Sequence, residues 1–488
     1  MYQRITKEGL FNYYFDQNGD REIFERASKK CYLPTNRILL NLIDQHKHEK
    51  KKVKVAFSLS GVFLEQCELF NKDVLESFKE LAATKCVEFL GQTYFHSLCS
   101  LFPINDEFVE QVKMHRQIIH DLLGVEPKVF ENTELLYNNS IAKEIEKLDY
   151  DGIYVEGAER ILKDKSPNNV YVAKNCKKLR VLLRNYKLTD DIGFRFSTRD
   201  WAEWPLTADK YATWLTATPG QCINIFPDYE TFGEHHWPET GIQEFLSKII
   251  LEIFKHDSLK LVTPSEVIKK HKPIDTIDVP EFNTVSWADL RRDTSGWLGN
   301  TMQWAYYSTV RDMEGLVKES QNSHFLKTWR YFQISDHLYY MFTGGGAPSE
   351  VHGYFSPFGT PTDAFITGQS AVMDFEMRLR TFTVTANDPF RFYKGVGKKM
   401  FTGITALSLK GFIDVISKVE RKSIEFHKKR GDFEKWAKFS LQNKKLASQF
   451  RKICKSKLKG EPLKNAIKQT AEKCFEDVIN KTLDLGYY

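Results

Sequence analysis

Strand and helix patterns alternate through the first half of the chain, and this alternation restricts the folds that it can adopt. Helical segments with apolar residues at a spacing near 3.6, such as 74–81 and 108–123, lie between most of the strand patterns. The strand patterns are short β-rich runs at residues 53–59, 86–90, 128–130, 152–155, 170–173, 179–183, 222–226 and 259–262. Such alternation predicts a parallel sheet covered by helices, here closed into a β/α barrel. Segments 175–178 and 198–209 break the rhythm, so the barrel is expected to be irregular.

The length of 488 residues exceeds one ordinary domain, and three domains are predicted. Residues 1–268 are expected to form the barrel, and residues 269–384 a helical domain that closes over its cleft. Residues 385–488 are expected to form a basic helical accessory domain, because residues 391–488 hold 24 Lys and Arg against 10 Asp and Glu. That charge is compatible with an acidic or polyphosphate partner, or with a simply solvated basic surface.

The overall composition excludes several classes of protein. A formal net charge of +6 selects neither nucleic acid nor a membrane surface as a partner, and neither is expected. The eight cysteines show no CxxC pair, so they are interpreted as reduced thiols. The chain begins without an apolar leader and has no long uncharged apolar window, which favours a cytoplasmic protein.

Acidic residues follow two of the predicted strands. Glu134 comes shortly after the strand at 128–130, and Asp228 directly after the strand at 222–226. Barrel enzymes keep their chemistry at the carboxyl ends of the strands. Cleavage of a glycosidic bond needs two such acids, one to attack the anomeric carbon and one to move a proton. Either residue alone could instead be a helix cap or a surface acid.

A metal site is the competing interpretation of the same segment. Asp228 with His235 and His236 resembles the ligand sets of sugar deacetylases, which share a similar barrel. However, the sequence shows no pair of histidines four residues apart with a glutamate and no third convergent imidazole. Neither a metal nor another cofactor is therefore expected.

Ordered motifs along residues 12–380 resemble glycoside hydrolase family 57, and specifically its intracellular α-amylase-like branch. The resemblance rests on segments 91–97 (GQTYFHS), 130–135 (FENTEL), 188–196, 226–235, 287–303, 335–337 (SDH) and 354–357 (YFSP). It implies a retaining glycoside hydrolase that acts on α-1,4-glucans, either a polymer or maltooligosaccharides. A 4-α-glucanotransferase and a catalytically impaired glucan-binding protein are the alternatives.

The resemblance also implies roles for individual residues. It makes Glu134 the nucleophile and Asp228 the general acid/base. The first must be ionised, and the second must hold a proton, so burial or carboxylates such as Glu230 and Glu234 should raise the pKa of Asp228. The matching motifs place three residues beside the scissile bond: His96, Asp336 and His337. Two tryptophans could serve as platforms for outer glucose units or as core residues: Trp201 and Trp204.

The sequence departs from the family pattern in four places. Family members open on a strand that ends in His-Gln-Pro, whereas residues 1–10 contain no histidine, so a seven-stranded barrel without its first strand is expected. Either the start lies too far downstream or the protein is a degenerate relative. Gln92 stands where relatives usually carry an acid, and Glu131 where they carry Arg. Strand alternation is expected to turn Glu131 away from Glu134. Residues after 385 resemble a small helical domain attached to archaeal sugar-metabolism proteins, a regulatory or oligomerising module.

Overall fold

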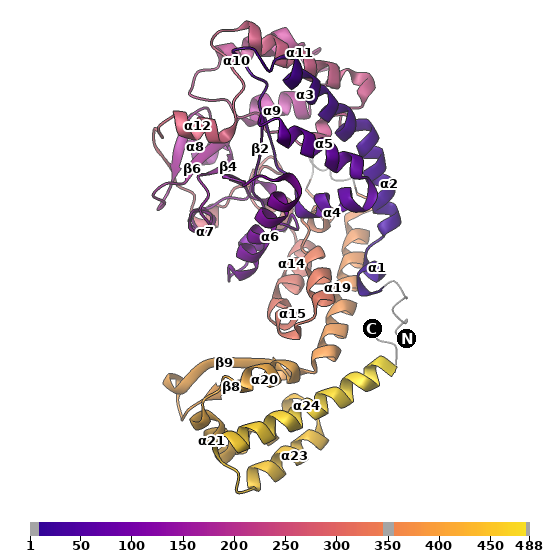
Figure 1. Ribbon diagram of the computed structural model, residues 1–488, viewed down its shortest axis with the longest axis vertical. Coiled ribbons are helices and arrows are strands. Elements are labelled where there is room, and N and C mark those ends of the chain that lie inside the picture. The colour runs from indigo at the N-terminus through magenta and orange to yellow at the C-terminus, as the bar shows by residue number, and fades with distance from the viewer. Residues whose placement is uncertain (1–8, 345–355, 485–488) are drawn as a thin grey trace. The chain divides into compact units, whose positions relative to one another are not determined.

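The computed structural model describes residues 9–344 and 356–484, with the side chains of 480–484 left aside (Figure 1). The motif at 354–357 therefore lies partly outside the described residues. The chain divides into two compact units, which we call the sheet unit and the C-terminal unit. The sheet unit comprises Gln17–Gln303 and Gln333–Pro361, and the C-terminal unit comprises Met1–Asp16, Trp304–Phe332 and Thr362–Tyr488. The three-domain division at 268 and 384 stays a prediction.

The described residues of the sheet unit form seven short strands. They are β1 (Val55–Phe57), β2 (Val87–Phe89), β3 (Val129–Glu131), β4 (Gly152–Glu156), β5 (Val170–Ala173), β6 (Arg180–Arg184) and β7 (Thr276–Ile277). β1 and β2 form a parallel pair, and the other five are ordered β3-β4-β6-β5-β7. A parallel bridge between Gly91 and Phe130 connects the end of β2 to β3, and a second joins Arg184 to Asn224.

The predicted seven-stranded parallel barrel is not confirmed. Among the described residues the strand pairing does not close, and β5 runs antiparallel to β6. Only residues 174–179 connect these two strands, a length that permits a hairpin and is too short for a parallel crossover. The segment at 222–226 contributes only the Asn224 bridge, and 259–262 forms no strand. The mixed α/β class expected from the alternation is what the structure shows.

Helices of the sheet unit pack around this sheet. Their bounds are α2 (Gln17–Ala27), α3 (Leu33–Gln45), α4 (Gly61–Phe70), α5 (Lys72–Ala83), α6 (Asp106–Leu123), α7 (Asn139–Lys147), α8 (Glu159–Leu162), α9 (Tyr186–Gly193), α10 (Ala208–Ala217), α11 (Ile242–Lys255), α12 (Pro264–Lys270), α13 (Ser295–Leu298) and α17 (Asp336–Tyr339). The sequence predicted α5 and α6 from their apolar spacing. α5 begins where the Asn71 side chain accepts a hydrogen bond from the Asp73 amide, and α6 ends at Gly124, whose φ is 68°.

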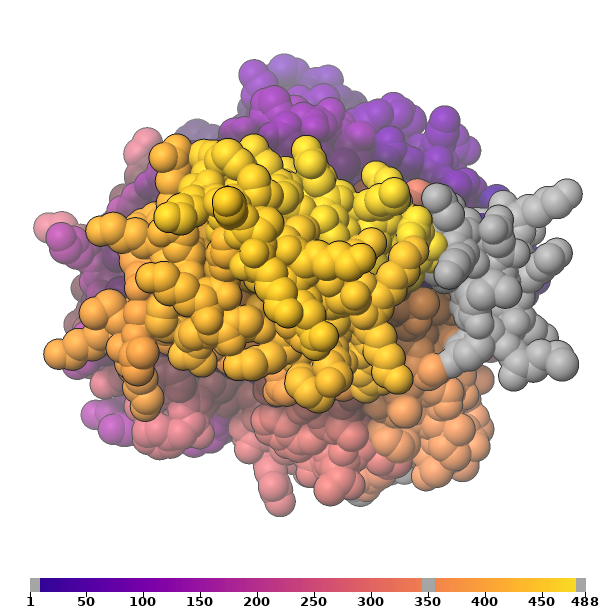
Figure 2. Space-filling model, turned by 90° about the horizontal axis from the view of Figure 1, so that it is seen from below, coloured from indigo at the N-terminus to yellow at the C-terminus, as the bar shows by residue number. Residues whose placement is uncertain are grey.

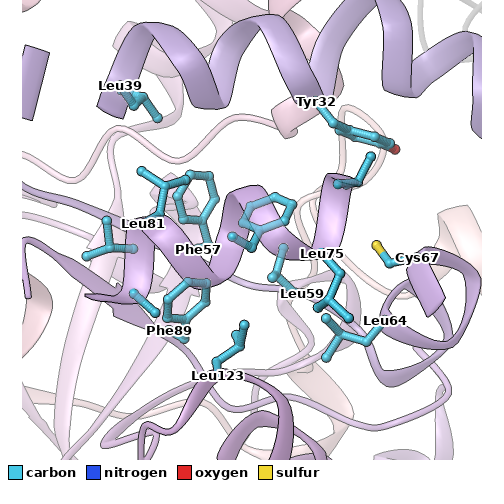
Figure 3. Close-up of a cluster of buried hydrophobic side chains, with 14 of the residues drawn as sticks. Tyr32, Leu39, Phe57, Leu59, Leu64, Cys67, Leu75, Leu81, Phe89 and Leu123 are labelled. Carbon is cyan, nitrogen blue, oxygen red and sulfur yellow. The ribbon is translucent and has the colours of Figure 1, made fainter. Parts of the chain in front are cut away.

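One apolar core joins β1 and β2 to their helices. Phe57 and Phe89 lie beside Leu75 and Leu81 of α5, with Leu39 of α3 above them (Figure 3). Burial of such side chains contributes about 25 cal/mol per Å² of apolar surface, which makes this cluster a principal stabilising element of the sheet unit. It fixes the strands whose carboxyl ends carry the polar residues described below.

The C-terminal unit is mainly helical, and it also contains a hairpin. Its helices are α1 (Gly9–Tyr14), most of α14 (Thr301–Asp312), α15 (Glu314–Ser320), α16 (Ser323–Tyr331), α19 (Pro361–Thr383), α20 (Leu409–Ile416), α21 (Arg421–Arg430), α22 (Asp432–Lys435), α23 (Lys444–Lys455) and α24 (Gly460–Asp484). Antiparallel strands β8 (Thr385–Tyr393) and β9 (Phe401–Ser408) correct the all-helical prediction for 385–488. Alternating apolar residues such as Phe390 and Phe392, both buried, explain the strand.

The hairpin and the following helices share one core. Phe390, Phe412, Phe433, Trp436 and Phe450 pack together in it. These segments form the orange and yellow body of Figure 2. Within the described ranges, no helix is long and apolar enough to cross a membrane.

Candidate active site

Glu134 lies in a short turn at the carboxyl end of β3. The 3-10 helix η3 (Thr133–Leu135) follows that strand, and Glu134 adopts φ 59°, a left-handed conformation that is uncommon outside glycine. Two groups hold its carbonyl oxygen: Ser286 Oγ donates at 2.8 Å and the Trp287 amide at 3.2 Å. A strained residue held from several sides is typical of functional sites.

The buried carboxylate of Glu134 has three hydrogen-bond donors. His96 Nε2 lies 3.2 Å from Oε1, Ser335 Oγ donates to the same oxygen at 2.7 Å, and Trp287 Nε1 donates to Oε2 at 2.7 Å. Burial raises the pKa of Glu134, but the hydrogen bonds from His96, Trp287 and Ser335 outweigh it, so the net shift is downward. Glu134 is therefore ionised at neutral pH.

His96 links Glu134 to a second buried carboxyl. Its Nδ1 lies 3.1 Å from Gln92 Oε1, Gln92 Nε2 donates to Ser58 Oγ at 2.8 Å, and Ser58 Oγ donates to Glu131 Oε2 at 2.8 Å. Because Gln92 Oε1 and the Glu134 carboxylate both accept, His96 donates from both nitrogens as an imidazolium. Burial lowers the pKa of His96, but Glu134 raises it to a net value of about 9.

Glu131 faces this network, against the expectation from strand alternation. Its charge interacts with those of His96 and Glu134, and burial raises its pKa to about 7 although His96 lowers it. The alternation argument fails because β3 ends at Glu131 and the chain then turns through η3, so Glu134 does not lie on the strand. A negative Glu131 raises the pKa of His96 here.

Asp228 lies directly before the 3-10 helix η4 (Tyr229–Phe232) and is half-buried. Burial raises its pKa, the charges of Glu230 and Glu134 raise it further, and His235 and Arg184 oppose them. The expected contribution of Glu230 is thus present, and Tyr32 Oη fixes that side chain by a hydrogen bond of 2.6 Å. Asp228 and Glu134 therefore lie within one electrostatic cluster with opposite pKa shifts.

Two further carboxylates near Asp228 differ in their role. Glu234 is held by Arg26, whose Nε donates at 2.7 Å. Asp336, the first residue of α17, is exposed to solvent, yet the protein around its carboxyl raises its pKa to about 6. His96 lowers that pKa, while the charges of Glu134 and Asp228 raise it. Asp336 therefore belongs to the cluster at a place that solvent reaches.

A buried arginine supports the segment that carries Asp228. Arg184 Nε donates to the Phe226 carbonyl at 2.8 Å, and its other nitrogens bind Glu156 at 2.9 Å and Asp190 at 2.8 Å. Two carboxylates compensate the burial of this guanidinium, which is the condition for a tolerable buried charge. Arg184 thus fixes the backbone two residues before Asp228.

The predicted tryptophans lie elsewhere in the sheet unit. Trp201 packs against Trp214 with ring centroids 6.3 Å apart in a separate apolar cluster, and Trp204 is 43% exposed. Two aromatic residues that do reach the cluster are Trp287, whose indole donates to Glu134, and Tyr339. The pKa of Tyr339 rises through burial and through the charges of Glu134 and Asp228. Sequence reasoning missed Trp287 and Ser335 as site residues, although each opens one of the quoted motifs.

The histidines after Asp228 do not form a metal centre. His236 Nε2 lies 3.0 Å from the carbonyls of Ile192 and Gly193, and its Nδ1 accepts from Ser197 Oγ at 2.8 Å. His337 lies in α17, where its amide donates to the Ile334 carbonyl at 3.3 Å. Among the residues that the structure describes, no group of three or more His, Cys, Asp or Glu could hold a metal ion.

The fold and the site together define a class of protein: an α/β protein in which an ionised carboxylate and a carboxyl with a raised pKa share one cluster at the strand ends. Comparison with known sequences gives the family. The model of the family described as "Glycosyl hydrolase family 57" matches residues 1–280. A protein from Methanocaldococcus jannaschii named "Putative alpha-amylase" is 46% identical over 388 residues, which cover 78% of this chain and 82% of that one. The chain belongs to glycosyl hydrolase family 57.

Solved structures share the fold at low sequence identity. The branching enzyme of Thermococcus kodakaraensis gives a TM-score of 0.56 at 15% identity, covering 75% of this chain and 86% of its own. The branching enzyme of Pyrococcus horikoshii gives 0.55 at 14% identity with the same coverages, 75% and 86%. The 4-alpha-glucanotransferase of Thermococcus litoralis gives 0.54 at 16% identity over 76% of this chain and 58% of that enzyme.

Proposed function

We propose that this protein is a retaining glycoside hydrolase of the α-amylase type, acting on α-1,4-glucan polymers or maltooligosaccharides. One observation carries the proposal: two carboxyls in one cluster have opposite pKa shifts, downward for Glu134 and upward for Asp228. Such a division is what a nucleophile and a proton donor require. The name of the relative and the glucan-processing titles of the solved structures support this substrate class.

The proposed reaction has two displacements. The Glu134 carboxylate attacks the anomeric carbon while Asp228 gives its proton to the departing glycosidic oxygen, which leaves a glucosyl ester on Glu134 and an ionised Asp228. Water then attacks the same carbon, Asp228 takes its proton, and Glu134 leaves as a carboxylate. Two inversions return the starting anomeric configuration, and Asp228 regains its proton.

The neighbours of the pair have supporting roles in this proposal. His96, Ser335 and Trp287 hold Glu134 as an anion, so they favour its departure in the second displacement. Asp336, with its solvent-exposed carboxyl, is placed to bind sugar hydroxyls, and His337 beside it has the same proposed role. The exposed Trp204 and the half-buried Trp201 remain proposed platforms for outer glucose units.

Chemical rescue tests the two assignments separately. In a Glu134→Ala variant, azide should attack the anomeric carbon directly and give a glycosyl azide of inverted configuration. In an Asp228→Ala variant, azide should resolve the glucosyl ester and give the retained anomer. An exposed Glu239→Gln variant serves as the control and should keep its activity. Two results would contradict the assignment. One is a glycosyl azide of retained configuration from Glu134→Ala, and the other is no rescue by azide in either variant while the parent is active.

The same assays separate the alternatives. A glucanotransferase passes the glucosyl group to a sugar hydroxyl, so it should form longer oligosaccharides from maltooligosaccharides faster than reducing ends appear. An impaired glucan-binding protein should bind maltooligosaccharides with equal affinity in the parent and in Glu134→Gln, without turnover in either. The cytoplasmic location belongs to this proposal too, supported by eight cysteines that are all free thiols.

A further inference from the structure

The C-terminal unit contains a hollow of its own, between the β8–β9 hairpin and the segment from α21 to Ser440. Its volume is about 590 Å³. The residues that line it are Asp388, Pro389, Phe390, Arg391, Tyr393, Gly395–Lys398, Phe426, His427, Arg430, Asp432, Lys435, Trp436, Phe439 and Ser440. This volume falls within the range of small-molecule sites, roughly 300–1,000 Å³. All of these residues lie outside the glycosidase site.

Positive charge exceeds negative charge around the hollow. Arg430 is paired with Asp432 at 3.1 Å, and that aspartate also holds His427 at 2.7 Å. In contrast, Arg391, Lys398 and Lys435 form no ion pair with any carboxylate among the described residues. They are exposed, and Asp388 is the one lining carboxylate outside the Asp432 pairings. Three cations without carboxylate partners therefore line one hollow, and the Lys435 ammonium also donates to the Arg430 carbonyl at 3.0 Å.

Flat aromatic side chains stand among these cations. The ring of Phe439 is 65% exposed, although exposure of so large an apolar surface to water is unfavourable. Lys438 Nζ lies 4.9 Å from the centroid of this ring. The Arg430 guanidinium lies 5.2 Å above the ring of Phe426. Exposed rings beside guanidinium and ammonium groups can stack on a sugar or a base while the cations bind its phosphate.

The walls of the hollow are held by partly buried hydrogen bonds. The Tyr393 amide donates to His427 Nε2 at 2.9 Å, and His427 Nδ1 donates to Asp432 at 2.7 Å. Trp436 Nε1 donates to the Asp388 carbonyl at 2.9 Å. The hairpin and the helices are thereby joined on both sides of the hollow, so its cationic side chains project from a preformed framework.

We propose that this hollow binds a phosphorylated small molecule, with the phosphate on Arg391, Lys398 and Lys435 and a flat or sugar ring against Phe439. Guanidinium and ammonium groups bind phosphate by charge-assisted hydrogen bonds. The inference is independent of the proposed glycosidase function, because no residue of the hollow belongs to that site. A nucleotide and a sugar phosphate present the same chemistry here, and the probes below distinguish them.

Calorimetric titration of the full chain at 0.1 M salt tests the proposal with adenosine triphosphate, glucose 1-phosphate and inorganic phosphate as probes. We expect one of the two organic phosphates to bind more tightly than inorganic phosphate. Which of them does so identifies the ligand as a nucleotide or a sugar phosphate. The double variant Arg391→Gln/Lys398→Gln should weaken that binding by about tenfold or more, because two charge-assisted contacts are lost. Phe439→Ala should weaken the binding of the organic phosphate and leave the binding of inorganic phosphate unchanged.

The matched control removes the same charge from another face of the same domain. Lys444→Gln/Lys452→Gln also deletes two exposed cations that have no ion-pair partner among the described residues, here on α23. Non-specific attraction to a basic surface predicts equal losses in the two double variants and would overturn the proposal, as would no binding of any probe. Since the readout is binding, the result is independent of whether the protein cleaves glucans.

Discussion

At the scale of single residues, the balance of burial and hydrogen bonds on Glu134 is the decisive feature. A carboxylate with no solvent around it would bind a proton at neutral pH, but three donors make the anion the preferred form. Of the three donors named above, only the Trp287 indole contacts Oε2. Its hydrogen bond therefore contributes to the lowered pKa that keeps Glu134 ionised and able to attack.

A Trp287→Phe variant tests this balance. The lost donor should raise the pKa of Glu134, and because only the ionised form attacks, the acidic limb of kcat/KM against pH should move to higher pH. At neutral pH, kcat/KM should fall about tenfold or more, which is the loss of one hydrogen bond to a charged group. The half-exposed Trp237→Phe serves as the control and should keep the parent profile. An unshifted acidic limb in Trp287→Phe would show that this indole does not tune Glu134.

The residues of the site were predictable where they lie in motifs that resemble those of the family. Glu134, Asp228, His96 and Asp336 were singled out from the sequence, and the structure brings all four into one cluster. Trp287 was missed, although it opens a quoted motif, because its role depends on a tertiary contact of its indole nitrogen with Glu134 that no local pattern encodes. Strand alternation misplaced Glu131, since a period of two holds only while the strand continues.

At the scale of elements, the turn η3 depends on the segment that carries Ser286. Ser286 is fully buried, its hydroxyl donates to the Glu134 carbonyl, and Trp297 Nε1 donates to the same hydroxyl at 3.0 Å. That pair of contacts fastens a left-handed turn that would otherwise relax. Ser286 thus acts through the backbone of Glu134 as a positioning residue.

A Ser286→Ala variant should misplace Glu134 without altering its chemistry. We expect kcat to fall about tenfold with KM nearly unchanged, since a misaligned nucleophile costs rate more than binding. Unfolding in urea should show a loss of about 1–3 kcal/mol, because the buried Trp297 indole loses its acceptor and the Glu134 carbonyl keeps only the Trp287 amide as donor. The exposed Ser417→Ala provides the comparison and should alter neither quantity. A change in KM alone would contradict the positioning role.

The sequence predicts helices well where their apolar spacing continues over several turns. It predicts strands poorly where a single tertiary contact decides which residues pair. The amphipathic spacing of α5 and α6 is long enough to define them. The apolar run at 222–226 looks the same as a strand, yet only Asn224 makes a bridge. Its side chain donates to the Leu183 carbonyl at 2.9 Å, a tertiary contact that no local pattern encodes.

At the scale of the whole molecule, the grouping of segments is the least predictable feature. Phe11 packs on Tyr331 with centroids 4.6 Å apart, and Tyr14 Oη donates to Asp374 at 2.7 Å, so α1 belongs with helices over 300 residues away in the sequence. Composition did reveal that basic residues concentrate after residue 390. The charge of a segment can be counted from the sequence without knowledge of the fold, whereas long-range packing cannot be predicted in that way.

Function and stability should oppose each other in this protein, because several carboxyls of the site carry raised pKa values. Glu131 titrates at about 7 and Asp336 at about 6, both above the ordinary carboxyl range. A raised folded-state pKa gives stability that is complete below the unfolded pKa and is lost as pH rises through the folded value. The two residues should therefore cost stability between about pH 4.5 and pH 8.

A Glu131→Gln/Asp336→Asn variant tests this opposition across the whole fold. Its free energy of unfolding should equal that of the parent near pH 4 and exceed it by on the order of 2 kcal/mol at pH 8, measured in urea at a series of pH values. Most of this gain should come from Glu131, since water screens the exposed Asp336. Comparing the two proteins at each pH cancels the titrations that do not depend on these two carboxyls, such as that of buried His115. A pH-independent difference would mean that these carboxyls do not exchange protons on folding.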